Sequence, residues 1–167
     1  MLHFLFLILA FPVLLPVAEA GAAGSGIAWR GWDAALREAK SKGRPVLVDV
    51  YTNWCGWCRR MDRDVYERAD VRAYLDAHFV SVKLNAEAAD PARYEGKAHT
   101  SRSLASRFRV TGYPTTVFLS ASGGHLVNVP GYIPPQRFLL LLRFIGDGHY
   151  DRGESFQDFE RASGGGL

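Results

Sequence analysis

The sequence predicts an α/β fold with a central mixed sheet, in which the core strands are parallel, a C-terminal hairpin is antiparallel and helices cover both faces. Three observations predict it. Strand-like and helix-like segments alternate through most of the chain, which is typical of parallel strands joined by helical crossovers. The segment 45–51 is apolar nearly throughout, as in strands that are covered on both sides. Two later strand-like segments are separated by "ASGG", a turn typical of a β-hairpin.

Length and composition place the chain among globular proteins of one domain. It has 167 residues, of which 48% are hydrophobic and 22% charged, and this balance provides for a packed core. The formal net charge is only +3, and no basic run or stripe occurs. We therefore expect no nucleic-acid partner.

The N-terminal twenty residues predict export. They contain "LHFLFLILAFPVLLPVA" followed by small residues at Ala18 and Ala20, which fit a signal-peptidase site, although no Lys or Arg precedes the apolar run. The run is shorter than the ~20 apolar residues of a spanning helix, and Pro12 and Pro16 interrupt it. We expect a cleaved signal peptide and a periplasmic or otherwise exported protein; an uncleaved signal anchor is the alternative.

The rest of the chain divides into a flexible spacer (21–26), one folded domain (27–162) and a disordered Gly-rich tail (163–167). We expect the protein to be a monomer.

The first half of the domain predicts a helix, a strand and two further helical stretches. The segment "WDAALREAKSKG" has helical apolar spacing, with Asp33 as its expected N-cap and Gly43 at its end. The strand 45–51 follows, and the cysteine segment comes directly after it. Cys58, Met61 and Val65 then recur at helical spacing, and Asp70 is the expected cap of the next helical stretch.

The second half predicts a strand over 79–85, a surface loop over 86–100, and a short helix capped by Ser101. The hairpin strands "TTVFLS" and "HLVNVP" come next. A helix "PQRFLLLLRFIG" then begins at Pro135, and a final short helix has Ser155 as its cap. The long helix is apolar on nearly all sides, so we expect it to be buried on more than one side or to contact a partner.

The two cysteines of the chain, Cys55 and Cys58, predict redox chemistry. A disulfide between them closes a very short loop and adds little stability, so its use is expected to be chemical. Cys55 falls at a helix start, where backbone N–H groups and the helix dipole stabilise the nucleophilic thiolate. Cys58 lies one turn further on and can resolve the mixed disulfide. A structural zinc needs more ligands than this segment offers, which leaves capture of a soft metal such as Cu(I), or a bystander disulfide, as alternatives. We expect no metal and no cofactor besides the disulfide itself.

These residues resemble the active-site segment of the thioredoxin family. "VLVDVYTNWCGWC" matches its strand, its aspartate six residues before the first cysteine, and its Trp-Cys-Gly-x-Cys; the matching residues are Asp49, Trp54, Cys55, Gly56 and Cys58. "VKLN" is similar to the family's next strand and "VTGYPTTVFL" to its cis-proline loop, which matches Lys83 and Pro114; Gly131 matches the glycine before the last helix. The resemblance covers about residues 45–145 and implies a thioredoxin fold.

The chain departs from ordinary thioredoxins in four respects. Trp57 replaces the usual proline between the cysteines, no proline kinks the helix after Cys58, the loop 86–100 is longer, and an export signal precedes the domain. The Trp-Cys-x-x-Cys followed by a charged, Met-containing helix is more similar to exported bacterial thioredoxin-like proteins and to the thioredoxin domain of membrane-embedded disulfide reductases.

The resemblance implies roles for the neighbours of the cysteines. Asp49 is expected to be desolvated, with a raised pKa, and to move protons to and from Cys58, although a solvent-facing carboxylate at the strand end is the alternative. Lys83 either modulates Asp49 or is an exposed strand lysine. Trp54 and Trp57 either form an apolar collar around the sulfurs or pack the helix on the sheet.

The segment Tyr113–Pro114 is expected to contain a cis peptide bond beside the cysteines and to bind a substrate strand through backbone groups, with Gly56, Trp54 and Trp57 as further substrate contacts. An ordinary turn is the alternative.

We therefore predict a thiol–disulfide oxidoreductase of the bacterial envelope, in which Cys55 attacks and Cys58 resolves. We expect it to reduce protein disulfides with electrons from a membrane donor. A soft-metal or thiol-protein chaperone that uses Cys55 and Cys58, and a non-catalytic interaction domain, are the other hypotheses.

Overall fold

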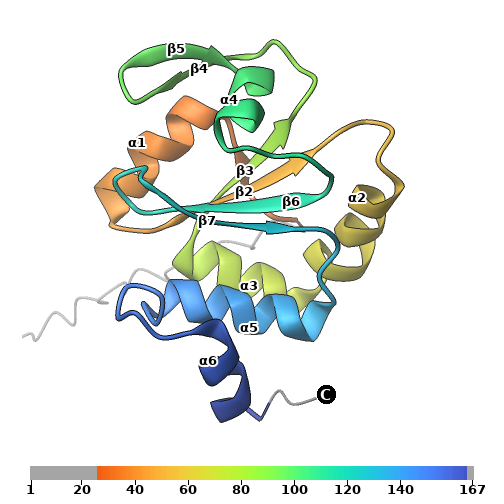
Figure 1. Cartoon of the computed structure of the whole chain (residues 1–167), viewed down its shortest axis with the longest axis vertical. Helices are drawn as coiled ribbons and strands as arrows, with labels where there is room; N and C mark the ends of the chain where they lie inside the picture. The colour runs from red at the N-terminus through yellow and green to blue at the C-terminus, as the bar shows by residue number, and fades with distance from the viewer. Residues whose placement is uncertain (1–25, 165–167) are drawn as a thin grey trace, which may run out of the picture.

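The computed structural model describes residues 26–164 and contains a five-stranded mixed sheet in the order β1-β3-β2-β6-β7 (Figure 1). Its strands are β1 (Trp29–Arg30), β2 (Val46–Tyr51), β3 (Val80–Asn85), β6 (Thr115–Leu119) and β7 (His125–Pro130). β1, β3 and β2 are parallel, whereas β6 and β7 are antiparallel to their neighbours. This arrangement confirms the predicted fold class. The predicted signal peptide (1–20) and most of the spacer and tail lie outside the described residues.

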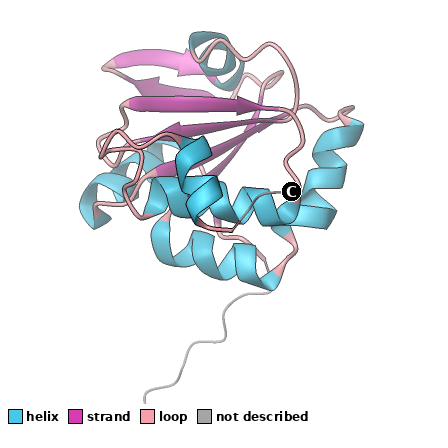
Figure 2. Cartoon of the chain, turned by 60° about the horizontal axis from the view of Figure 1, so that its bottom comes forward, coloured by secondary structure: helices cyan, strands magenta, loops and turns pink. Residues whose placement is uncertain are grey.

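Helices cover both faces of the sheet (Figure 2). One face packs against α1 (Trp32–Lys42) and α4 (Ser101–Arg107). The other packs against α2 (Gly56–Met61), a π-helical turn (Asp62–Tyr66), α3 (Ala69–His78) and α5 (Pro135–Gly146), and α6 (Phe156–Ala162) lies on α5. β2 is buried from both sides, as its apolar sequence predicted. The cysteine turn therefore follows the C-terminal end of the central, buried strand, which fixes its position.

Three of the predicted helix caps were wrong. α1 begins after Gly31, and the Asp33 carboxylate instead accepts a hydrogen bond from the Arg93 backbone N–H. α3 begins after Arg68, with Asp70 inside its first turn. Thr100, one residue before Ser101, caps α4. Two of these side chains have other partners: Asp33 accepts from Arg93, and Asp70 accepts from Arg68 and from the Val71 N–H. The predicted cap of α6, Ser155, is confirmed by its bond to the Asp158 N–H.

The segment 86–100 is not a loop throughout, as was predicted, because it contains a second, two-stranded sheet. β4 (Pro91–Tyr94) and β5 (Lys97–Thr100) form an antiparallel hairpin whose turn residues, Glu95 and Gly96, both have positive φ. Asp33 and the Trp32 indole, which donates to the Arg93 carbonyl, fasten this hairpin to α1. A mostly exposed strand pair carries little of the apolar pattern that identifies strands in a sequence.

The apolar helix α5 is buried on several sides, one of the two outcomes expected. It packs on the sheet, on α3 and on α6, which bury Phe138, Leu142 and Phe144. α3 and α5 approach closely at Gly146, where an added Cβ would lie 2.9 Å from the Tyr74 hydroxyl oxygen.

Candidate active site

Cys55 and Cys58 are joined in a disulfide at the N-terminus of α2, directly after the turn that follows β2. Cys55 is the N-cap, and its sulfur accepts a hydrogen bond from the Cys58 N–H at 3.0 Å. Their Cα atoms are 5.3 Å apart, a separation that one helical turn supplies without distortion. Each cysteine is 4% exposed. The helix start therefore presents a hydrogen-bond donor and its positive dipole end to the first sulfur.

A buried carboxylate lies on the strand that leads into this turn. Asp49 is 2% exposed and pairs in register with Lys83 on β3, whose ammonium lies 3.4 Å from Asp49 Oδ2. Burial raises the pKa of Asp49 to about 6, against the opposing effect of the Lys83 charge. Among residues 26–164, Asp49 Oδ1 has no hydrogen-bond partner. A carboxylate with this pKa and a free oxygen can accept and release a proton near neutral pH.

Sequence reasoning missed a third member of this cluster, Asp62. It begins the π-helical turn after α2, and its carboxylate forms an ion pair with the same Lys83 ammonium. Its negative charge also contributes to raising the pKa of Asp49. The available signal was the spacing, since Asp62 lies four residues after Cys58 on what reads as one helix.

The Lys83 ammonium is held between its two carboxylates and three aromatic rings. It lies 5.2 Å from the ring centre of Trp29, 5.3 Å from that of Tyr51 and 5.8 Å from that of Tyr66. These contacts fix the charge beside Asp49. Lys83 is thus a partner of the buried carboxylate rather than a free surface lysine.

Aromatic side chains flank the cysteines in the sequence and contact one another in two pairs. Trp54 is 66% exposed and Trp57 54% exposed, whereas Tyr113 is half-buried. The Trp54 ring contacts Tyr113 edge-on, and the Trp57 ring contacts Tyr132, a residue that sequence reasoning missed. These four residues form what we call the aromatic collar. Exposed indoles that are not packed into the core provide apolar surface for a bound molecule.

Polar contacts position the two tryptophans. The Trp54 indole N–H donates to the Glu87 carboxylate at 2.9 Å. The Arg60 guanidinium lies over the rings of both Trp57 and Tyr132, and it also pairs with Asp64. The collar is therefore held in place without being buried.

The proline loop carries Tyr113 of the collar and leads directly into β6. The peptide bond between Tyr113 and Pro114 is cis. The Pro114 carbonyl accepts a hydrogen bond from the N–H of Gly131, whose φ of 88° is one that glycine adopts without strain. The contact between Tyr113 and Trp54 brings this loop to the cysteine turn. Gly56, between the cysteines, is exposed.

Two searches of the described chain bear on the type of site. Between residues 26 and 164, no three His, Cys, Asp or Glu side chains are grouped so as to hold a metal ion. Over the same residues, no helix is both long and apolar enough to cross a membrane.

Known proteins share this fold and this site. The model of a thioredoxin-like domain matches residues 32–146. A thiol:disulfide interchange protein, DsbD, of Ralstonia nicotianae is 36% identical over 113 residues, which are 66% of this chain but 17% of that protein. The disulfide bond reductase DsbH of Chlamydia pneumoniae is 24% identical over 67% of each protein. The chain thus spans about a sixth of its DsbD relative and two thirds of its DsbH relative.

Solved structures agree with these matches. A thioredoxin from Thermus thermophilus superimposes with a TM-score of 0.62 and 30% identity, covering 77% of this chain and 94% of that one. A thioredoxin-fold protein from Helicobacter pylori gives a TM-score of 0.65 and 25% identity over 72% and 80% of the two chains. The chain therefore belongs to the thioredoxin-like family, and Cys55–Cys58 is the disulfide of its Cys-x-x-Cys segment.

Proposed function

We propose that this protein reduces protein disulfides in the bacterial envelope, with Cys55 as attacking and Cys58 as resolving thiol. The observation that carries the proposal is the Cys55–Cys58 disulfide at the start of α2, with the Cys55 sulfur at the N-cap. This position stabilises the Cys55 thiolate once the disulfide is reduced.

The reaction has two exchange steps. The Cys55 thiolate attacks one sulfur of the substrate disulfide, forms a mixed disulfide and releases the other substrate sulfur as a thiolate, which is then protonated. The Cys58 thiol next loses its proton, and its thiolate attacks Cys55 Sγ. The second substrate thiol leaves, and Cys55–Cys58 becomes a disulfide. Two electrons pass to the substrate, and the structure holds the pair in the oxidised form that this sequence leaves.

Asp49 is the proposed acceptor of the Cys58 proton. It is buried on the strand that precedes the cysteine turn, and with a pKa raised to about 6 by burial it is ionised at neutral pH yet basic enough to take a proton. Lys83 and Asp62 adjust this basicity in opposite directions.

The collar is the proposed substrate surface. Trp54, Trp57 and Tyr113 offer exposed aromatic area beside the sulfurs, and the chain around Gly56 and Pro114 supplies backbone close to them. Such contacts depend little on the substrate's sequence, as expected for an enzyme that acts on many disulfides.

The cellular setting rests on the N-terminal sequence and on the relatives. Export by a signal peptide over residues 1–20 would place the domain (27–162) in the periplasm. The protein would act there as a monomer. In an oxidising compartment, the Cys55–Cys58 disulfide of a reductase must be reduced again after each turnover. We therefore propose a membrane dithiol as its electron donor. The relative named a disulfide bond reductase agrees with the reducing direction.

Insulin reduction by the dithiol-charged protein, together with the redox potential of the Cys55–Cys58 couple, tests this function. We expect reduction that is lost in Cys55→Ser, and a potential near the ~−270 mV of thioredoxin. A potential near −120 mV, the approximate value for a strong oxidant, would contradict the reducing direction. Tight Cu(I) binding without insulin reduction would favour the soft-metal alternative.

A further inference from the structure

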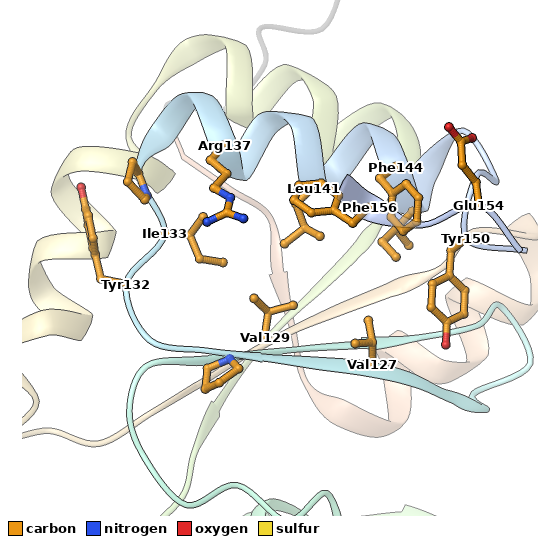
Figure 3. Close-up of a pocket in the computed structure, with 13 residues that line it drawn as sticks. Val127, Val129, Tyr132, Ile133, Arg137, Leu141, Phe144, Tyr150, Glu154 and Phe156 are labelled. Atoms are coloured by element: carbon orange, nitrogen blue, oxygen red, sulfur yellow. The ribbon is translucent and has the colours of Figure 1, made fainter. Parts of the chain in front are cut away.

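A cavity of about 400 Å³ lies between β7 and α5, outside the redox centre just described. Its walls are largely apolar and come from Val127, Val129, Ile133, Leu141, Phe144 and Phe156. Figure 3 shows the two valines of β7 facing Leu141 and Phe144 across it, with Tyr132 at one end and Tyr150 at the other. A cavity of this size and lining is within the range of sites that bind ligands.

The cavity adjoins the aromatic collar at Tyr132. This residue lines the cavity, and its ring is also 5.6 Å from that of Trp57, next to Cys58. Arg60 lies over both rings. An extended chain whose cysteine is held at Cys55 would reach the cavity by passing the Trp57–Tyr132 pair.

The cavity runs along β7, an edge strand of the sheet. Within residues 26–164, β7 is the edge strand beyond β6. Edge strands offer main-chain donors and acceptors to an added polypeptide strand. Near the far end, the Tyr150 hydroxyl donates to the Leu126 carbonyl, which closes that part of the edge.

One wall of the cavity lies outside the family match. The family match ends at residue 146, whereas Tyr150, Glu154 and Phe156 belong to the segment that follows. That segment is anchored by the contacts of Phe156 and Phe159 with the Phe144 ring. The C-terminal extension therefore turns one face of β7 and α5 into a cavity.

We infer that this cavity docks an extended apolar segment of the substrate polypeptide next to the cysteine under attack. The inference rests on the proposed function. A mixed disulfide at Cys55 makes docking intramolecular, so even a weak apolar contact acts at a high effective concentration. The lining selects aliphatic or aromatic side chains, because a polar chain would lose its water without gaining partners there.

The test compares two peptide disulfides that differ only beside one cysteine, where one carries a four-residue Val/Leu segment and the other a Ser/Thr segment. A small disulfide, oxidised glutathione, reports the redox centre alone. Val127→Arg places a charge in the cavity, and His125→Arg on the same strand is its control, because His125 is exposed and does not line the cavity. Phe156→Ser and its exposed neighbour Gln157→Ser form a second pair, in case the first variant folds poorly.

We expect the unaltered protein to reduce the apolar peptide about tenfold faster than the polar one, the factor that burial of one aliphatic side chain is worth. Val127→Arg and Phe156→Ser should lose this preference and keep the rate with oxidised glutathione. The controls His125→Arg and Gln157→Ser should keep the preference and the rate. Equal rates for the two peptides, or a preference that survives both cavity variants, would overturn the inference. A protein that dimerises through this face and becomes monomeric in Val127→Arg would also overturn it, since a second copy would then fill the cavity.

Failure of the proposed function gives a different result, namely no reduction of glutathione or of either peptide. Docking is then measured as binding of the apolar peptide in which Ser replaces Cys. Shifts of the Val127 and Val129 amide resonances on its addition would support the cavity as a docking site, and their absence would count against it.

Discussion

Cys55 and Cys58 occupy unequal positions on one helical turn. The Cys55 sulfur stands at the N-cap and accepts a backbone hydrogen bond, whereas Cys58 lies inside the helix and donates that bond through its own N–H. Only the first sulfur therefore has a donor and the dipole end directed at it, and these lower the pKa of a thiol placed there.

Alkylation of the reduced protein at mildly acidic pH should accordingly modify Cys55 first, as peptide mass analysis would show. Cys58→Ser should accumulate mixed disulfides with substrates, because nothing is left to resolve them, and Cys55→Ser should accumulate none. Faster labelling of Cys58 would reverse the assigned roles.

Lys83 and Asp62, the two charged neighbours of Asp49, change its pKa in opposite directions, which can be tested. Lys83 lowers the pKa of Asp49 and Asp62 raises it. Lys83→Met should therefore move the pH midpoint of mixed-disulfide resolution upward, and Asp62→Asn should move it downward, because Asp49 must be ionised to accept the Cys58 proton. The measurement is the rate of resolution against pH.

Asp64→Asn is the matched control for Asp62→Asn. Asp64 lies on the same π-helical turn but pairs with Arg60 rather than Lys83, so its replacement should leave the midpoint in place. Shifts of equal sign in Lys83→Met and Asp62→Asn would show that Asp49 is not the titrating base.

At the scale of elements, the helix after the cysteines changes its winding at Asp62. α2 ends at Met61, and the π-helical turn Asp62–Tyr66 follows. Cys58, Met61 and Val65 are all buried, as their helical spacing predicted. The wider turn also buries Tyr66 beside Val65. Such single π-turns within helices are frequent at functional sites, and this one carries Asp62 to Lys83.

The contact between α3 and α5 depends on a residue without a side chain. A Cβ at Gly146 would lie 2.9 Å from the Tyr74 hydroxyl oxygen and 3.1 Å from a Phe79 ring carbon. Overpacking of this kind lowers the free energy of unfolding by about 1–3 kcal/mol. The better helix propensity of alanine offsets up to about 1 kcal/mol of this loss.

Gly146→Ala should thus lower the free energy of unfolding by about 1 kcal/mol in denaturant titrations, with the rate of glutathione reduction unchanged. Gly112→Ala is the control, because an added Cβ there meets no atom within 4 Å. Equal stability of the two variants would mean that α3 and α5 separate at no cost.

The sequence predicted those helices and strands whose structure is determined by their own residues. It missed contacts that depend on residues far away in the sequence. β2, β3 and α5 lie within a residue of their predicted bounds, because an apolar strand or a Pro-to-Gly helix is encoded in its own residues. Asp62 and Tyr132 were missed, because their partners, Lys83 and Trp57, are 21 and 75 positions away and the π-helical turn is set by packing. The register of Asp49 with Lys83 was reached only through the family resemblance.

At the scale of the whole molecule, burial of the Asp49 carboxylate costs stability, and the proton transfer proposed for Asp49 would be the reason to keep it. The pKa of Asp49 is raised from 3.8 to about 6 because burial disfavours its charged form. Between these two values the folded protein binds more protons than the unfolded chain, so its stability falls as pH rises through this window. Below about pH 4 both states are protonated, and the cost vanishes.

Asp49→Asn, which carries no charge, should therefore be more stable than the unaltered protein at pH 7 by up to about 3 kcal/mol, from about 1.4 kcal/mol per pKa unit. The gain should shrink steadily from pH 6 to pH 4, as thermal or denaturant unfolding of the oxidised protein would show. Asp76→Asn, at an exposed position on α3, should show no such trend. The stabilised Asp49→Asn variant should also resolve mixed disulfides more slowly, because Cys58 has lost its proton acceptor. A gain that persists at pH 4, or a variant that is stabilised but resolves at the normal rate, would remove Asp49 from the proton transfer.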